Sequence, residues 1–422
     1  MIKTIEEVII LNDYATITGG STAVAVASAI GLAGRGVRVT YFSCVGPVAA
    51  ELLATPNLDV VCLDQPEIAK DSNPLRALAS GLRNGGAVDA LRALLADKDP
   101  ERVIVHAHTW MKALSPYALD TVAGMGFELV VTLHDFFITC PNGGFFDYPA
   151  RELCHRRPLS LSCVTCNCDR RNYGHKLWRT ARTLLQNHLL RMPRRVAAYV
   201  GVSEFSLALM RPHLPADIPA TVVRNPVDAI DTGPADAGAN RVFLYIGRLV
   251  PEKGVRLFAE AVAASGLPAV FVGDGELMPE LRELCPQAEF TGWLKPAQIR
   301  ERLRTARALV FPPLWYETLG LVAVEAAAAG VPAIIADGCA AVDYVHHGRT
   351  GLHFRQGSVA ALTERMRELA DDDALAGKLG RAAYDWYWAD PWTAERHVED
   401  LLSTYRARVK AEPAPYETAM QT

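Results

Sequence analysis

Two carboxylates, Glu317 and Glu325, lie eight residues apart around the expected start of a helix rich in small residues. The apolar run before them must end at Pro312-Pro313, because proline cannot donate to a strand ladder. Gly320 then begins the expected helix. Eight helical steps would separate the carboxylates by roughly 12 Å, which exceeds the about 5 to 9.5 Å of an acid/base pair. That separation suits two contacts to one long polar ligand. The alternative is one glutamate on a solvated face and one at a helix cap.

A pair of cations, Arg248 and Lys253, occupies a glycine-bounded turn earlier in the chain. The turn follows 242–246, which is typical of a fully buried strand, and precedes an amphipathic helix. Arginine presents a planar fork to phosphate oxygens and lysine a point charge. A helix start adds unpaired N–H groups and partial positive charge. Together with the glutamate segment, the turn predicts a phosphate-binding site; alone, it could be a solvated basic loop.

Five of the nine cysteines lie close together in the sequence: Cys140, Cys154, Cys163, Cys166 and Cys168. A Cys-x-x-Cys pair with two further thiols predicts a closed tetrahedral zinc site formed by Cys140, Cys154, Cys163 and Cys166, with Cys168 as a spare. An iron–sulfur cluster uses the same ligand type and stays open as an alternative. A run of free thiols is the third interpretation. Four thiolates leave no open position on a metal, so the expected role is structural.

Composition limits the classes of function. A chain of 422 residues, half of them hydrophobic, is long enough for two or three domains. Its net charge of −4 argues against a general nucleic-acid binder. Its start lacks the plan of a signal peptide, and its longest apolar stretches, such as 23–33, fall short of the ~20 residues of a membrane span. We expect a cytoplasmic protein, whose cysteines do not form structural disulfides in that reducing compartment.

Short β-like runs alternate with helical stretches, which predicts parallel sheets covered by helices. The expected strands are 8–11, 37–42, 60–63, 103–106, 128–133 and 198–202 in the first half, and 242–246, 269–272, 289–291, 308–311 and 333–336 in the second. A segment rich in Gly, Pro and Asp, 229–240, is the expected hinge between the halves. Ligands of such sheets bind beyond the carboxyl ends of the strands, so the two domains should face each other across a cleft.

An ordered set of short motifs resembles the retaining glycosyltransferases of family four. The motifs are Thr18-Gly19-Gly20, Val105-His106-Ala107-His108, Thr132-Leu133-His134-Asp135, Gly201-Val202-Ser203, Asn225-Pro226-Val227-Asp228, Gly247-Arg248-Leu249 with Lys253-Gly254, 272–276, Thr291-Gly292-Trp293 and 317–332. They span most of the chain in the order the family has them. The resemblance implies the GT-B fold, an α/β architecture of two Rossmann-like doubly wound domains facing a central cleft.

The resemblance also implies how the chain divides. An acceptor-side domain is expected over 1–228, with a Cys-rich insertion at 140–168. A nucleotide-sugar-binding domain is expected over 241–390. A helix at 391–412 is expected to cross back to the first domain, and 413–422 has the composition of a frayed tail.

In such an enzyme Arg248 and Lys253 would bind the departing diphosphate, because fixed cations act where negative charge develops. N–H groups near Leu321 and Val322 would add to that charge stabilisation. Gly20 would let the backbone approach the phosphates, where a side chain would obstruct it. An ordinary Gly-Gly turn is the alternative for that position.

The resemblance gives the two glutamates different roles. Glu317 would contact sugar hydroxyls and Glu325 the ribose hydroxyls, with Gly292 beside the base. It implies retention at the anomeric carbon without a divalent metal. No residue presents itself as a covalent nucleophile, so the expected mechanism is front-face attack, with the leaving phosphate taking the acceptor's proton.

Several histidines follow expected strands. His134 matches the family's active-site histidine, which contacts the donor sugar. Asp135 either orients His134 or serves the acceptor, and the sequence does not separate these roles. His106 and His108 also lie at a strand end, and we expect both to be structural.

Positive charge gathers in 151–195, which holds eleven Arg and Lys against Glu152 and Asp169, a balance of about +9. Within it, 176–191 has helical spacing, and basic amphipathic helices bind anionic membrane surfaces. A solvated face or an interdomain surface is the alternative. Because many members of the family glycosylate lipid-linked sugars, we expect a glycan or polyprenyl-linked acceptor, and a peripheral position on the inner membrane face.

The expected activity is transfer of a hexose-type sugar in surface polysaccharide or glycolipid biosynthesis. A GT-B-fold epimerase or phosphorylase is an alternative that would need no separate acceptor. A metal-bearing nucleic-acid-binding protein is another, but it leaves Arg248, Lys253 and the glutamates unexplained. A dehydrogenase is disfavoured because no GxGxxG follows the first strand.

Overall fold

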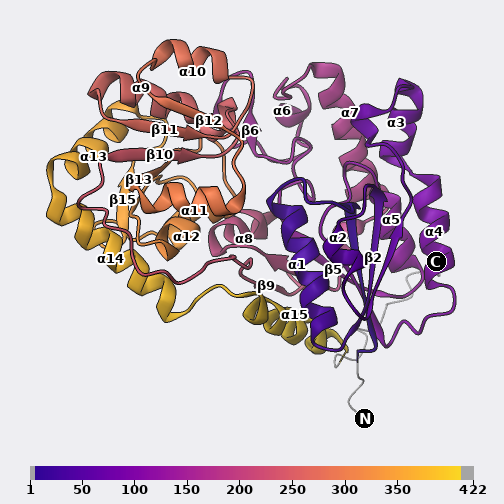
Figure 1. Ribbon diagram of the computed structural model, residues 1–422. Helices are drawn as coiled ribbons and strands as arrows, with labels where there is room; N and C mark the ends of the chain where they lie inside the picture. The colour runs from indigo at the N-terminus through magenta and orange to yellow at the C-terminus, as the bar shows by residue number, and fades with distance from the viewer. Residues whose placement is uncertain (1–4, 410–422) are drawn as a thin grey trace.

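A computed structural model describes residues 5–409, which form two α/β domains, each on its own parallel sheet (Figure 1). The first sheet has strand order β3-β2-β1-β4-β5-β8-β9. Its strands are β1 (Glu7–Tyr14), β2 (Arg38–Val45), β3 (Leu58–Cys62), β4 (Val103–Ala107), β5 (Glu128–Leu133), β8 (Ala198–Gly201) and β9 (Ala220–Val222). All the pairs are parallel. Every residue of β1 is buried, as expected of a central strand covered on both faces.

The second sheet has order β12-β11-β10-β13-β14-β15, again with parallel pairs. Its strands are β10 (Val242–Ile246), β11 (Ala269–Val272), β12 (Glu289–Gly292), β13 (Ala306–Phe311), β14 (Ala333–Ala336) and β15 (Gly351–Phe354). Two doubly wound sheets confirm the predicted fold class. Strand order reverses beside β1 and β10, where such sheets bind ligands.

Helices cover both sheets. Those of the first domain are α1 (Gly20–Gly34), α2 (Ala50–Leu53), α3 (Pro74–Leu82), α4 (Gly85–Leu95), α5 (Pro116–Gly124), α6 (Leu161–Val164), α7 (Tyr173–Leu184) and α8 (Glu204–Met210). Those of the second are α9 (Val255–Ser265), α10 (Met278–Leu284), α11 (Pro296–Arg304), α12 (Leu321–Ala328), α13 (Val359–Asp371) and α14 (Asp373–Ala389). A two-stranded antiparallel pair, β6 (Phe146–Asp147) with β7 (Glu152–Leu153), lies in the Cys-rich insertion.

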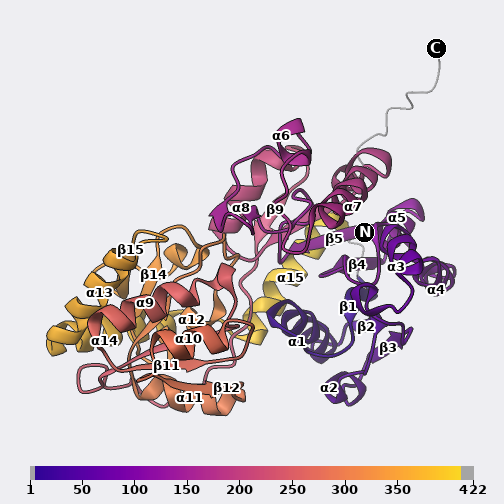
Figure 2. The ribbon, with the colours of Figure 1, turned by 90° about the horizontal axis from the view of Figure 1, so that it is seen from above.

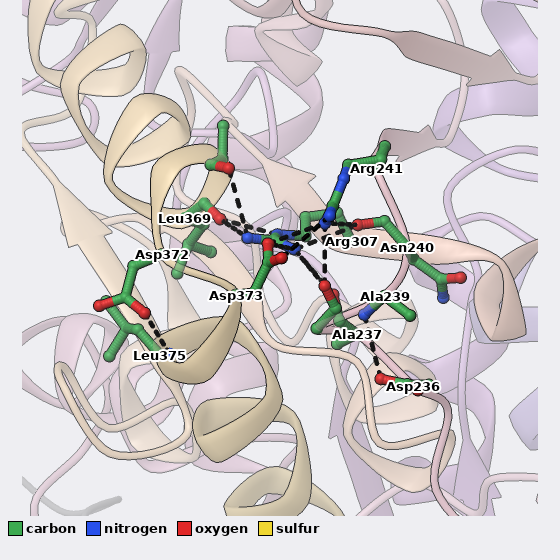
Figure 3. A network of polar contacts seen from close by, with 12 residues as sticks. Asp236, Ala237, Ala239, Asn240, Arg241, Arg307, Leu369, Asp372, Asp373 and Leu375 are labelled. Carbon is green, nitrogen blue, oxygen red and sulfur yellow. Dashed lines mark hydrogen bonds and ion pairs between the residues drawn. The ribbon is translucent and has the colours of Figure 1, made fainter.

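The segment 229–240 between the domains is bonded to the second domain. Arg307 of β13 is fully buried and donates to the carbonyls of Gly238 at 2.6 Å and Asn240 at 3.2 Å. It also meets the Asp373 carboxylate at 2.7 Å (Figure 3). One buried guanidinium therefore joins the end of this segment to the start of α14.

The last described helix, α15 (Ala394–Val409), returns to the first domain and packs beside α1 (Figure 2). His397 Nε2 lies 2.8 Å from Ser28 Oγ, and the Tyr405 hydroxyl lies 2.6 Å from His106 Nδ1. The end of the expected crossing helix, 410–412, and the expected tail lie outside the described residues. Across 5–409, no helix is both long and apolar enough to cross a membrane.

Candidate active site

A cavity of about 520 Å³ lies between the domains and is lined from both. Seven of the nine residues predicted for transfer and donor binding line it: Gly20, His134, Arg248, Lys253, Glu317, Leu321 and Val322. Glu325 and Gly292 do not line it. Segments more than 200 residues apart in the sequence thus meet at one site.

An ion pair, Lys253 with Glu317, forms one wall of the cavity. Lys253 Nζ lies 2.5 Å from Glu317 Oε2, and the same oxygen accepts from Trp315 Nε1 at 2.9 Å. The ammonium also lies 5.2 Å from the centre of a Trp315 ring. Gly254 follows with a φ of 67°, and a Cβ there would stand 1.8 Å from the Pro312 carbonyl oxygen. Only glycine fits this turn, which holds Lys253 against the end of β13.

Arg248 leaves its guanidinium in the cavity. Its side chain is 57% exposed, and its nearest carboxylate, Glu252, is 3.9 Å away. Glu252 also takes a contact of 3.4 Å from Arg170, whose guanidinium reaches Glu276 at 2.6 Å. Arg170 directly follows the Cys-rich insertion of the first domain, so it bridges the two domains beside the cationic turn. Arg248 remains free to meet an anionic ligand.

Two helix N-termini face each other across the cavity. α12 begins after Gly320, whose φ is 80°; a Cβ there would lie 2.7 Å from the Phe311 ring. α1 begins at Gly20 in the other domain, and a Cβ on Gly20 would lie 3.9 Å from Leu321 Cδ1. Free N–H groups and the helix dipole at both ends favour an anion between them.

The structure corrects the spacing argument for the two glutamates. Only Glu325 lies in α12, while Glu317 lies in the loop before Gly320. The eight-step helical separation predicted from the sequence is therefore wrong, because a left-handed glycine interrupts the path. Burial raises the pKa of Glu325, with Arg300 opposing and Asp228 adding to the shift.

Gly292 ends β12 with a φ of 70°. Its carbonyl accepts from the Gly273 N–H at 2.9 Å, which joins two glycine turns at the carboxyl edge of the second sheet. Trp293 beside it is largely exposed.

His134 follows β5 and lies between the domains. Its carbonyl accepts from the Thr318 hydroxyl of the second domain at 3.1 Å, and its Nε2 lies 3.0 Å from His108 Nδ1. Burial lowers the His134 pKa to about 3, with His397 adding to the shift. The ring is therefore neutral at physiological pH and can offer hydrogen bonds, but no charge.

Asp135 also lines the cavity. Its Oδ1 accepts from the Phe137 N–H at 3.0 Å, and no hydrogen bond to His134 is present among residues 5–409. Burial raises its pKa to about 6, against the lowering effect of that backbone N–H and of Lys112. The sequence left two roles open for Asp135, orienting His134 or contacting the acceptor. The absence of a hydrogen bond to His134 in the described part of the chain favours contact with the acceptor.

One cation of the cavity, Lys112, was not predicted from the sequence. It is exposed at the first-domain wall. Its loop is held by the buried Asp13 carboxylate, which accepts N–H bonds from Lys112 at 3.0 Å, Ala113 at 2.8 Å and Leu114 at 2.9 Å. The sequence could have indicated Lys112 through its position, because Asp13 and Lys112 lie near the carboxyl ends of two paired parallel strands, β1 and β4.

The predicted metal site finds no matching geometry. Lys176 of α7 is fully buried, and its ammonium donates to Cys163 Sγ at 3.5 Å. Burial lowers the pKa of Lys176, but Cys168, Cys163 and Cys140 raise it by more, so the net shift is upward. A buried cation thus lies among three of the five thiols.

The other two thiols of the cluster have polar partners of their own. Cys166 Sγ donates to Asp147 Oδ2 at 3.2 Å, and Arg156 Nη1 lies 3.7 Å from Cys154 Sγ. Across 5–409, no three Cys, His, Asp or Glu side chains converge as metal ligands. The thiols as placed do not fit the zinc site or the iron–sulfur cluster. The metal stays a prediction, which metal analysis of purified protein tests.

Much of the charge in 151–195 is internal. Lys176 and Arg182 are buried. Five more cations are in ion pairs: Arg156 with Asp147, Arg170 with Glu252 and Glu276, Arg179 with Asp169, Arg194 with Asp217, and Arg195 with Asp120. Apolar side chains are exposed on this part of the first domain instead, among them Leu177, Leu184 and Leu189. The free positive surface is smaller than the sequence balance indicates.

Two family models match the chain. One is described as Glycosyltransferase Family 4 and matches residues 18–230. The other is described as Glycosyl transferases group 1 and matches residues 230–386. They meet at residue 230, inside the expected hinge, and together cover both sides of the cavity.

Characterised relatives match part of the chain. A glycogen synthase of Mycobacterium tuberculosis is 33% identical over 208 residues, which is 42% of this chain and 48% of that protein. A D-inositol 3-phosphate glycosyltransferase of Streptomyces avermitilis is 31% identical over 194 residues, which is 40% of this chain and 41% of that protein. The chain therefore spans about half the length of the relatives it matches, or less.

Solved structures share the fold over almost the whole chain. Sucrose-phosphate synthase from Thermosynechococcus elongatus superposes with a TM-score of 0.71 at 17% identity, over 95% of this chain and 98% of that one. HepE from Anabaena, in complex with UDP and glucose, gives 0.64 at 17% identity, over 95% and 100%. At these identities the likeness establishes the GT-B fold alone.

Proposed function

This chain belongs to glycosyltransferase family 4, and from that membership we propose that it transfers a sugar from a nucleoside diphosphate sugar to an acceptor in the interdomain cleft. One observation carries the proposal. Arg248, Lys253 and the start of α12 meet the start of α1 around a single cavity. The diphosphate is the ligand group that matches two cations and two helix N-termini.

The pyrophosphate lies against the second domain. Arg248 contributes a free guanidinium fork and Lys253 an ammonium, while N–H groups of the α12 start add hydrogen bonds. These fixed positive groups stabilise the charge that develops on the leaving diphosphate. Gly20 allows the first domain to approach the phosphates from the other side, and that approach closes the cleft around them.

The sugar and nucleoside lie on either side of the diphosphate. Glu317 and His134 contact the sugar hydroxyls, and the HepE complex with UDP and glucose supports a donor of this class. Glu325 and Gly292 lie outside the cavity lining, toward the nucleoside end of the ligand. There Glu325 accepts from the ribose hydroxyls and Gly292 borders the base.

Transfer proceeds with retention at the anomeric carbon. The acceptor hydroxyl attacks from the face that the diphosphate leaves, and the departing phosphate oxygen takes the proton of that hydroxyl. Neutral His134 does not act as the base in this scheme. Arg248 and Lys253 supply the positive charge at the phosphates, so transfer needs no divalent metal.

The acceptor lies on the first-domain side, near Lys112 and Asp135. The proposal includes a hexose-type sugar and a glycan or polyprenyl-linked acceptor, and the likeness to a glycogen synthase supports the glycan. This acceptor class places the enzyme in surface polysaccharide or glycolipid synthesis. Exposed Leu177, Leu184 and Leu189 support a peripheral position on a membrane face, where apolar side chains can insert.

A panel of nucleoside diphosphate sugars, read by thermal shift, tests the donor. A specific donor raises the melting temperature by mass action. Lys253→Gln and Arg248→Gln should remove that shift and lower turnover about 100-fold. Arg256→Gln is the matched control, because Arg256 is a surface arginine of α9 paired with Glu280 at 2.7 Å and outside the cavity lining.

The products separate this proposal from its alternatives. Sugar appearing on an acceptor, with release of the nucleoside diphosphate, supports transfer. Conversion of the donor without an acceptor would instead identify an epimerase. Full turnover in both cavity variants would remove phosphate binding from the account.

A further inference from the structure

His108 is a buried histidine whose ring contacts that of His134. It is 2% exposed, and its Nδ1 lies 3.0 Å from His134 Nε2. The ring centroids lie 5.2 Å apart and the ring planes are 25° apart, as for two rings that meet edge to edge through these nitrogens. Burial lowers the pKa of both rings, that of His134 to about 3 and that of His108 well below its usual value. Two neutral rings share one hydrogen bond, so one nitrogen carries the proton and the other accepts it.

The other nitrogen of His108 decides the direction of that bond. Nε2 of His108 is buried and has no hydrogen-bond partner among residues 5–409. A buried N–H without an acceptor is rarer in proteins than an acceptor without a donor. The proton of His108 therefore belongs on Nδ1, from which it is donated to His134 Nε2. His134 Nε2 must then be bare.

We propose that His108 is a positioning residue that holds the proton of His134 on Nδ1, so that the ring offers the cleft an uncharged N–H donor. The inference deepens the proposed function, on which its consequence for the substrate rests. An N–H donor recognises an oxygen acceptor, such as a hydroxyl oxygen of the donor sugar. A protonated amino group at the same place offers no lone pair and is rejected.

A third buried histidine, His106, lies against the ring of His108. Its ring centroid lies 4.3 Å from that of His108. Its Nδ1 lies 2.6 Å from the Tyr405 hydroxyl and its Nε2 lies 2.7 Å from Thr132 Oγ1. Both nitrogens of His106 are therefore occupied, and it does not offer the partner that His108 Nε2 lacks. The prediction that His106 is structural stands, whereas His108 gains a role toward the cleft.

Long-range proton–nitrogen NMR of protein labelled with ¹⁵N-histidine reads the tautomer directly. At neutral pH we expect His134 and His108 to carry hydrogen on Nδ1 and none on Nε2. The signals are assigned by their loss in single variants. A proton on Nε2 of either ring would overturn the inference. This readout needs no substrate, so it can fail while the proposed function survives, and the reverse.

Variants extend the test to the reaction. His108→Leu removes the donor, and we expect mixed His134 tautomers with a loss of about 10- to 100-fold in kcat/KM. His108→Asn places an amide N–H near the former Nδ1 and should restore both. If the leucine variant does not fold, the asparagine variant decides through its His134 signals. His106→Asn is the control, and it should lower stability while His134 keeps its tautomer. Wild-type tautomer and turnover in His108→Leu would refute the role.

Discussion

At the scale of single residues, Glu317 has two roles that different measurements can separate. It neutralises Lys253 at 2.5 Å and, in the proposed function, it binds sugar hydroxyls. Glu317→Gln should leave the affinity for the nucleoside diphosphate alone unchanged or higher, because Lys253 loses its carboxylate. Turnover of the intact donor should fall about 100-fold, because the charged acceptor for the hydroxyls is gone.

Calorimetry with the nucleoside diphosphate and turnover with its sugar measure the two effects. Glu280→Gln is the control, since Glu280 pairs with Arg256 on the surface at 2.7 Å. An equal loss of both quantities in Glu317→Gln would mean that the residue only supports the fold of the turn.

Asp135 gives the cleft a pH dependence. Burial raises its pKa to about 6, so the carboxyl is neutral below that pH and charged above it. If the charged form serves the acceptor, kcat/KM for the acceptor rises about tenfold from pH 5 to pH 8. His134 does not titrate in this range, because its pKa is about 3. Rate profiles of wild type and Asp135→Asn check this, and an unchanged rise in the variant would assign the titration elsewhere.

At the scale of elements, the sequence predicts the strands whose patterns are local. The predicted 242–246, 269–272 and 333–336 coincide with β10, β11 and β14. Two strands of the parallel sheets were not predicted, β9 and β15, and they lie at edges of the two sheets. β9 is only Ala220–Val222, and β15 holds a glycine and a histidine in four residues. Short edge strands carry no continuous apolar run, so pairing with a neighbour defines them.

Residue spacing in the sequence does not predict which charged side chain will contact which partner, as two sites show. Cysteine spacing predicts a metal site, but it does not reveal that Lys176, on another helix, reaches Cys163. Glu317 and Lys253 were each singled out as site residues, yet their pairing depends on how two loops of one sheet edge meet. The order of the motifs predicts which residues line the cleft. Which of their charges form ion pairs depends on tertiary packing.

Arg307 is the clearest case of such packing. It is fully buried, and besides Asp373 it bonds to the carbonyl oxygens of Leu369, Gly238 and Asn240 (Figure 3). Arg307→Ala removes a fully buried side chain and the guanidinium bond to the Leu369 carbonyl, while Gly238, Asn240 and Asp373 keep their bonds to Arg241. We expect a loss of about 2 to 4 kcal/mol in the free energy of unfolding.

Arg241 provides the matched control. It bonds to the same Asp373 carboxylate at 2.8 Å and to the same carbonyls of Gly238 and Asn240, but it is more than half exposed. Arg241→Ala should cost about 1 kcal/mol or less, because solvent screens the pair. Urea denaturation of both variants measures the difference. Equal losses would mean that the acceptors shared by the two arginines, and not the burial of Arg307 with its bond to Leu369, stabilise this junction.

At the scale of the whole molecule, the cleft depends on contacts between domains. The Thr318 carbonyl accepts from Ser203 Oγ at 2.6 Å, while the Thr318 hydroxyl donates to His134. Such contacts join residues more than 100 positions apart, so periodicity predicts two domains but not how they meet. α15 adds a second connection, and through Tyr405 it reaches the buried histidines under the cleft.

The packing of α15 on α1 can be tested with one change at two positions. A Cβ at Gly31 would lie 2.4 Å from Val398 Cγ2, whereas a Cβ at Gly34 meets nothing within 4 Å. Alanine favours a helix over glycine by roughly 0.5 to 1 kcal/mol, but Val398 is buried and stiff at χ1. Gly31→Ala should therefore lower stability by about 1 to 3 kcal/mol, and Gly34→Ala should leave it unchanged or slightly raise it.

Thermal and urea unfolding give both values, and amide exchange locates the change. Protection should fall in α15 and around His106 in the first variant only. Stabilisation by both substitutions would show that α15 yields to the added methyl group, and that its contact with α1 does not hold the domains together.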